Sequence, residues 1–115
     1  MSQPGPPRGL REEERSLIVA LLSIADRGQL TTLTPETQAR DLQDGGMGSI
    51  RLHRPDPRRF GLEIARAEYG DVDGVRVSIT LSVDDRGELF ELDFWKVDFS
   101  PLKRYPKSSD VFITG

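Results

Sequence analysis

Residues 75–83 constrain the fold more than any other part of this sequence. Five apolar side chains alternate there with polar ones without interruption: Val75, Val77, Ile79, Leu81 and Val83. Strict alternation is typical of a strand with one buried face and one face in water. Asp84-Asp85-Arg86-Gly87 then predicts a turn, since glycine adopts positive φ without a steric cost. A second strand is expected from Glu88 onward.

We predict that these two strands form a hairpin in which Asp84 pairs with Gly87. This register places three apolar pairs on one face: Leu81 with Phe90, Ile79 with Leu92, and Val77 with Phe94. A shift by one residue would put Leu81 opposite Glu91 and turn the apolar side chains away from the core. After Phe94 the alternation changes parity. This change predicts either a β-bulge near residues 95–96 or a twisted strand end covered on both faces.

Residues 10–27 have the pattern of an amphipathic helix. Leu17, Leu21 and Ile24 recur at spacings of three and four residues. Three glutamates at 12–14 lie where a helix dipole favours negative charge, and Gly28 suits the position after the last turn. The apolar stripe of this helix needs a covering surface, and the predicted sheet provides one.

The middle of the chain allows two interpretations. Thr34-Pro35-Glu36 resembles a helix start. In the alternative that we favour, residues 37–43 form a strand, turn at Asp44-Gly45-Gly46 and return through residues 47–53. A loop at 54–57 and a strand at 60–69 follow, with Ala65 and Ala67 expected to face the helix.

The sequence therefore predicts an α+β fold, in which an N-terminal helix packs on an antiparallel β-meander of about four to five strands. Residues 10–115 are expected to form one domain, because 115 residues fit one ordinary domain. Residues 1–9 are rich in proline and glycine and have no apolar run, so we expect a disordered leader rather than a signal peptide. No apolar run is long enough to span a bilayer, and a cytoplasmic location is expected.

Composition and motifs argue against most kinds of catalytic or cofactor site. The chain has no cysteine, which excludes disulfides, thiolate nucleophiles and cysteine-bound metals. Its single histidine, His53, is expected to be a surface residue. The glycine run at 45–48 lacks the lysine of a phosphate-binding loop. We therefore predict no catalytic residue, no cofactor and no metal.

Charge is unevenly distributed along the chain. Residues 51–60 carry four arginines and one aspartate, and residues 84–98 carry six carboxylates and two basic side chains. Separated patches of opposite sign suit intramolecular pairing or the steering of a partner. The net charge of −3 argues against nucleic acid as that partner. Carboxylates at Glu91, Asp93 and Asp98 could hold a hard cation, although a solvated strand face explains them more simply.

Two segments, DGGMGS at residues 44–49 and GELFELDFWKVDFSP at residues 87–101, resemble those of a family of small uncharacterised bacterial proteins, catalogued as a domain of unknown function. The resemblance covers residues 10–106. It implies a bacterial source and no established activity. The acidic, aromatic strand is also similar to small α+β immunity proteins that neutralise toxins, by analogy of fold alone.

These observations lead to two hypotheses for function. The first is a non-enzymatic protein-interaction module, immunity-like in character, that binds a basic toxin or another protein through Glu91, Asp93, Trp95 and Asp98. The alternative is a small enzyme or ligand-binding domain with a pocket near the Gly45–Gly48 turn. The sequence specifies neither the partner nor the oligomeric state, and no membrane partner is expected.

Overall fold

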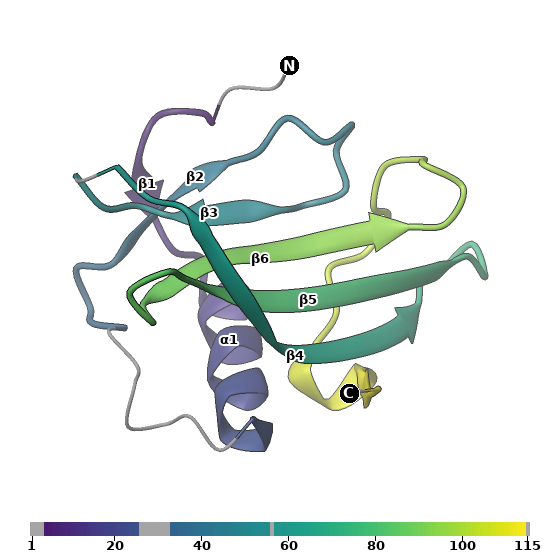
Figure 1. Ribbon diagram of the computed structural model, residues 1–115. Helices are drawn as coiled ribbons and strands as arrows, with labels where there is room; N and C mark the ends of the chain where they lie inside the picture. The colour runs from purple at the N-terminus through teal and green to yellow at the C-terminus, as the bar shows by residue number, and fades with distance from the viewer. Residues whose placement is uncertain (1–3, 26–32, 56, 115) are drawn as a thin grey trace.

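The centre of the fold is the β-meander that the alternating residues predict. In a computed structural model, which describes residues 4–25, 33–55 and 57–114, the meander consists of β4 (Phe60–Gly70), β5 (Arg76–Asp84) and β6 (Leu89–Lys96). These strands lie side by side and antiparallel (Figure 1). Ala65, Ala67 and Tyr69 alternate inward along β4, opposite the apolar residues of β5. The inward position predicted for the two alanines is confirmed.

A second hairpin extends the sheet beyond β6. β2 (Gln38–Asp41) pairs with β3 (Ile50–Leu52), and β3 pairs with β6. Two-residue strands complete the edges, since β1 (Arg8–Gly9) pairs with β2 and β7 (Phe112–Ile113) pairs with β4. The sheet order is β1-β2-β3-β6-β5-β4-β7. The α+β class is confirmed; the five longer strands reach the upper end of the expected number, and the two short ones extend the sheet to seven.

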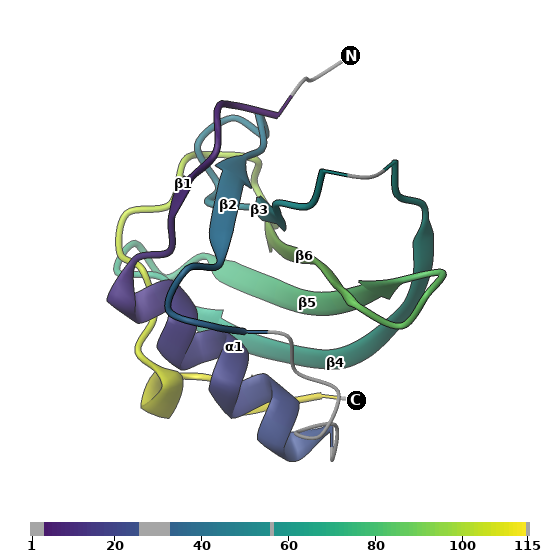
Figure 2. The ribbon, with the colours of Figure 1, turned by 90° about the vertical axis from the view of Figure 1, so that its left-hand side faces the viewer.

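The helix α1 (Glu12–Ile24) lies against β4 on one face of the sheet (Figure 2). Its apolar stripe packs into a core shared with the inward side chains of β2 to β6. Glu14 at the start of α1 accepts a hydrogen bond from the Arg11 amide at 2.8 Å, which satisfies one of the free donors of the first turn. Gly28, predicted to end the helix, lies outside the described residues. Among those residues, no helix has the length and apolar character needed to cross a membrane.

The alternative helix start at Thr34 is wrong. The Thr37 amide donates to the Thr34 carbonyl at 3.1 Å, and the Thr37 hydroxyl accepts from the Thr34 amide at 2.8 Å. These bonds form a turn that leads into β2. Hydroxyl groups at such positions compete with helical hydrogen bonds, which explains why a helix start and a turn have similar sequences here.

Arg8 and Gly9, which the sequence assigned to a leader, form the edge strand β1. Arg8 donates to Glu14 with both terminal nitrogens at 2.9 Å, and it forms a second two-point contact with Asp41. One guanidinium thus links β1, α1 and β2, and residues 8 and 9 belong to the sheet. The composition of a proline-rich segment gave no information about these contacts, because they depend on Glu14, six residues away, and on Asp41, 33 residues away.

The predicted register of the β5–β6 hairpin is wrong by two residues. Leu81 pairs with Leu92, Ile79 with Phe94, and Val77 with Lys96. One shift comes from the turn. The Asp84 amide donates to the Glu88 carbonyl, so the loop between them has three residues, and the last of these, Gly87, has φ +84°. The Asp84 carboxylate favours this longer loop by accepting from the amides of Arg86 and Glu88, both at 2.9 Å.

The second shift comes from an irregularity opposite Ser82 and Val83, where β6 contains the extra residue Phe90. Two shifts of one residue preserve parity, so Leu92 and Phe94 still face the core. The bulge that we predicted near residues 95–96 is also wrong. Alternation continues to Lys96, which faces inward and is completely buried.

Candidate functional site

The predicted site residues lie on and beyond the outer face of β6, opposite the face that packs against α1. Glu91 and Asp93 alternate with the buried Leu92 and Phe94, and Trp95 continues the same outward series. Asp98 lies beyond the end of β6. The strand therefore brings three of the four predicted residues onto one face, and the fourth lies in the segment that follows.

Three of the six carboxylates of residues 84–98 pair with arginines of the basic segment at residues 51–60. Arg51 pairs with Glu91 at 2.5 Å, Arg58 pairs with Asp84 at 3.1 Å, and Arg54 approaches Glu88 at 3.5 Å. The two oppositely charged segments thus pair within the molecule. This arrangement weakens the long-range field that steering by the carboxylates alone would need.

Phe90 contacts two of the arginines that form these ion pairs. Its ring lies between two guanidinium groups, with Arg51 at 4.9 Å and Arg58 at 5.0 Å from the ring centroid. Arg58 also donates to the carbonyl groups of Leu52 and Leu89, where β3 and β6 separate. Arg58 therefore closes the gap between the two strands, and its role is structural.

Asp93 has an unusual environment. Burial raises the pKa of Asp93 to about 7, with a further contribution from the charge of Glu91 and a hydrogen bond shared with it. Asp93 stays protonated in the folded protein at pH values where an ordinary aspartate is ionised. The outer face of β6 thus contains one carboxyl group, that of Asp93, which keeps its proton up to about pH 7.

This pKa predicts a specific pH dependence of stability. The native state holds a proton on Asp93 that the unfolded chain releases above about pH 4, so stability falls as the pH rises from about 4 to 7. We expect Asp93→Asn to remove this fall and to stabilise the protein at pH 8, relative to pH 5, by about 1 kcal/mol after allowance for solvent screening. Thermal unfolding of both proteins from pH 5 to pH 8 measures the difference.

Asp98→Asn is the matched control for this prediction. Hydrogen bonds from the hydroxyl and amide of Ser100 hold the pKa of Asp98 below its usual value. Asp98 is therefore ionised in both states above pH 5, and its replacement should leave the pH profile unchanged. A profile of Asp93→Asn that parallels wild type would contradict the assignment.

The most exposed feature of this region is aromatic. Trp95 and Phe99 expose 52% and 64% of their surface, and their rings meet edge to face with centroids 4.9 Å apart. Phe99 has φ +65° and is the non-glycine residue with positive φ in the described part of the chain. The backbone thus holds a bulky side chain in a conformation that costs free energy and keeps it in solvent.

Two sets of residues lie outside the predicted site. Phe99 lies four residues after Trp95 in the sequence, and only the fold shows that the two rings meet edge to face. Lys96 donates to Asp71 at 2.8 Å and to Asp73 at 2.7 Å, forming a buried cluster that sequence analysis missed. The sequence signal for the burial of Lys96 was its parity, because it shares the inward side of β6 with Leu92 and Phe94.

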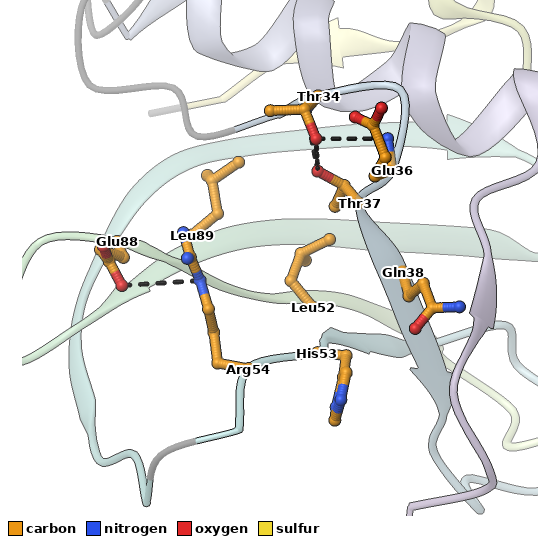
Figure 3. A pocket seen from close by; sticks show the side chains of 9 residues that line it. All are labelled: Thr34, Glu36, Thr37, Gln38, Leu52, His53, Arg54, Glu88 and Leu89. Atoms are coloured by element: carbon orange, nitrogen blue, oxygen red, sulfur yellow. Dashed lines mark hydrogen bonds and ion pairs between the residues drawn. The ribbon is translucent and has the colours of Figure 1, made fainter.

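The largest described pocket has a volume of about 480 Å³ and lies between the turn at residues 34–38 and the ends of β3 and β6. In Figure 3 the side chains of Leu52 and Leu89 point into it, and the Arg54–Glu88 pair borders one side. Residues 45–48, where the alternative hypothesis expected a pocket, line none of the five described pockets.

The glycine turn instead packs against the segment after β6. The Leu102 amide donates to the Gly46 carbonyl at 3.0 Å, and a Cβ on Gly46 would lie 3.2 Å from Pro101. Asp44 caps the turn by accepting from the amides of Met47 and Ser49. Within the described ranges, no group of three or more histidine, cysteine, aspartate or glutamate side chains is placed to hold a metal ion.

Comparison with known proteins gives one match. Residues 7–106 match the model of a family described as a domain of unknown function (DUF6984). The match agrees with the resemblance to an uncharacterised family and begins three residues before the expected limit. No curated protein and no solved structure matches the chain.

Proposed function

We propose that this chain, which belongs to the family described as a domain of unknown function (DUF6984), is a non-enzymatic protein-interaction module. Its binding surface is the outer face of β6 together with the segment that follows it, centred on Trp95 and Phe99. A bacterial source, a cytoplasmic location and an immunity-like role against a basic toxin are part of this proposal.

The exposed aromatic pair is the observation that carries the proposal. Aromatic side chains dominate the binding energy of protein interfaces when a partner removes them from water. Exposure of two stacked rings and of Val97, which is half exposed, costs free energy in the unbound protein. Positive φ at Phe99 adds to this cost, so binding is the simplest explanation for keeping these side chains in solvent.

The carboxylates beside the aromatic pair favour a basic partner. Asp98 is exposed and ionised, and Asp93 releases its proton when a cation approaches. Glu91 is already paired with Arg51, so it contributes less to an encounter than the sequence indicated. The proposed interface therefore relies on aromatic contacts for affinity and on the two aspartates for selectivity.

Affinity capture from an extract of the source organism tests the proposal. We expect the wild-type chain to retain a basic protein. The double variant Trp95→Ala/Phe99→Ala should retain at least about tenfold less of that protein, because each lost aromatic contact costs about 1 kcal/mol or more. The captured protein is identified by mass spectrometry, and its Kd for the purified wild-type and variant chains is then measured by calorimetry.

Val19→Ala/Phe112→Ala provides the matched control. Both side chains are as exposed as the aromatic pair but lie on α1 and β7. This control should bind like wild type. Equal binding by both double variants would refute the proposed surface, and loss of binding in both would assign the effect to surface hydrophobicity in general.

A second candidate function is the binding of a small molecule in the pocket of about 480 Å³. Its volume lies in the usual range for ligand sites, roughly 300 to 1,000 Å³. Two leucines provide an apolar base, and threonine, glutamate and arginine side chains provide polar groups at the rim (Figure 3). This combination of apolar base and few polar groups is typical of small-molecule sites.

A further inference from the structure

A second concave site adjoins the leucine-lined pocket and shares Leu52, His53 and Arg54 with it. Its volume is about 250 Å³, and it forms where β2, β3 and the β3–β4 connection meet the N-terminal segment at Pro4. Five basic side chains line it and no acidic one does so among the described residues: Arg40, Arg51, His53, Arg54 and Arg58. The chain as a whole carries a net charge of −3, so this concentration of cations is a local feature.

The carboxylates that pair with three of these arginines lie outside the pocket lining. Arg51 uses Nε and one terminal nitrogen for Glu91, which leaves its other terminal nitrogen without a described acceptor. Arg54 approaches Glu88 through Nε at 3.5 Å, and neither of its terminal nitrogens has a described acceptor. Arg58 differs, because Asp84 and two carbonyl groups use all three of its nitrogens.

Arg40 differs from the other three arginines because its described partners are uncharged. Its Nε donates to Nδ1 of His53 at 3.1 Å, and one terminal nitrogen makes a long contact of 3.4 Å with the Gly5 carbonyl. No described carboxylate pairs with it. Because Nδ1 of His53 accepts this bond, the histidine carries its proton on Nε2, which adds another donor at the same pocket.

We propose that this pocket binds the phosphate group of a small molecule. Guanidinium groups bind phosphate oxygens in a planar two-point geometry, and arginines with unused donors line this pocket. One of them, Arg40, has no described carboxylate partner. The volume is below that of drug-sized ligand sites and suits a single anionic group. This site shares Leu52, His53 and Arg54 with the leucine-lined pocket. The uncharged part of such a molecule could therefore occupy the leucine-lined pocket while its phosphate group binds here.

Titration with inorganic phosphate and with glycerol 3-phosphate tests the proposal. Chemical shifts of backbone amides and of arginine Nε–H groups are followed by ¹H–¹⁵N NMR at constant ionic strength, maintained with sodium chloride. We expect saturable shifts at Arg40, His53 and Arg54 with a Kd of about 1 mM. Arg40→Gln should weaken binding about tenfold, since it removes a charge-assisted donor.

Arg59→Gln is the matched control. Arg59 belongs to the same basic segment and its loss changes the net charge equally, but it does not line the pocket. This control should bind phosphate within about twofold of wild type. Tighter binding of glycerol 3-phosphate than of inorganic phosphate would identify a phosphomonoester as the ligand class, and the reverse order would identify free phosphate.

Three results would overturn the proposal: shifts that do not saturate, equal weakening by Arg40→Gln and Arg59→Gln, or unchanged binding by Arg40→Gln. His53→Gln gives an independent measurement if Arg40→Gln does not fold, and it should also weaken binding. None of these variants touches Trp95 or Phe99, so the result is separate from the test of the protein-interaction surface.

Discussion

Replacing Gly61 by alanine is expected to lower the free energy of unfolding by about 3 kcal/mol and the Tm by about 10 °C. A Cβ at this position would lie 2.2 Å from the carbonyl oxygen of Asp84, which is much closer than real atoms approach. β4 has a register irregularity between Phe60 and Leu62, so its backbone passes unusually close to the end of β5. Relief of the clash requires a shift of backbone rather than of a flexible side chain.

Gly70→Ala is the matched control in the same strand. A Cβ at Gly70 has no neighbour within 4 Å, and its φ is not positive. Its replacement should change stability by less than about 1 kcal/mol and can increase it, because alanine reduces the entropy of the unfolded chain. Circular dichroism melts of the two variants at pH 7 make the comparison. Similar Tm values for both would show that the approach of β4 to Asp84 is looser than described.

The second large effect is expected at Lys96. We expect Lys96→Met to lower the Tm by about 10 °C or more, because it leaves the buried carboxylate of Asp71 without its cation. Although burial opposes ionisation of Asp71, hydrogen bonds from Lys96 and from the amides of Lys103 and Val72 keep the pKa of Asp71 below its usual value. Lys96→Met removes the largest contribution that favours the charged form of Asp71, so the effect of burial is then opposed by the amide hydrogen bonds alone. Thermal unfolding at pH 7 measures this change.

The consequence extends beyond β6, since the same cluster holds the C-terminal segment. Asp71 accepts from the Lys103 and Arg104 amides, and Lys96 donates to the Pro101 carbonyl at 3.1 Å. Hydrogen exchange of these amides should increase in Lys96→Met. Lys103→Met serves as the control, because the Lys103 side chain is exposed and the amide bond to Asp71 remains. An unchanged Tm in Lys96→Met would mean that the cluster contributes little to stability.

The candidate site was predictable in part. Parity along β6 places Glu91, Asp93 and Trp95 together, and this follows from the side-chain period of a strand alone. The sequence allowed pairing between the acidic and basic segments but did not specify the partners, because Arg51 and Glu91 are 40 residues apart and Arg58 and Asp84 are 26 residues apart. The pairing of Glu91 with Arg51 is therefore a property of the tertiary structure, whereas the raised pKa of Asp93 comes mainly from burial and from Glu91 in the same strand.

Local patterns in the sequence predict the helix, the strands of the meander and the core-facing side of β6 as far as Phe94, and they favour the second hairpin. Those features follow from the local periodicity of apolar residues and from turn residues. Only the tertiary structure decided the register, the inward position of Lys96 and the place of Arg8 in the sheet. The physical reason is that polar side chains can be buried wherever distant partners satisfy them, as Asp71 and Asp73 satisfy Lys96.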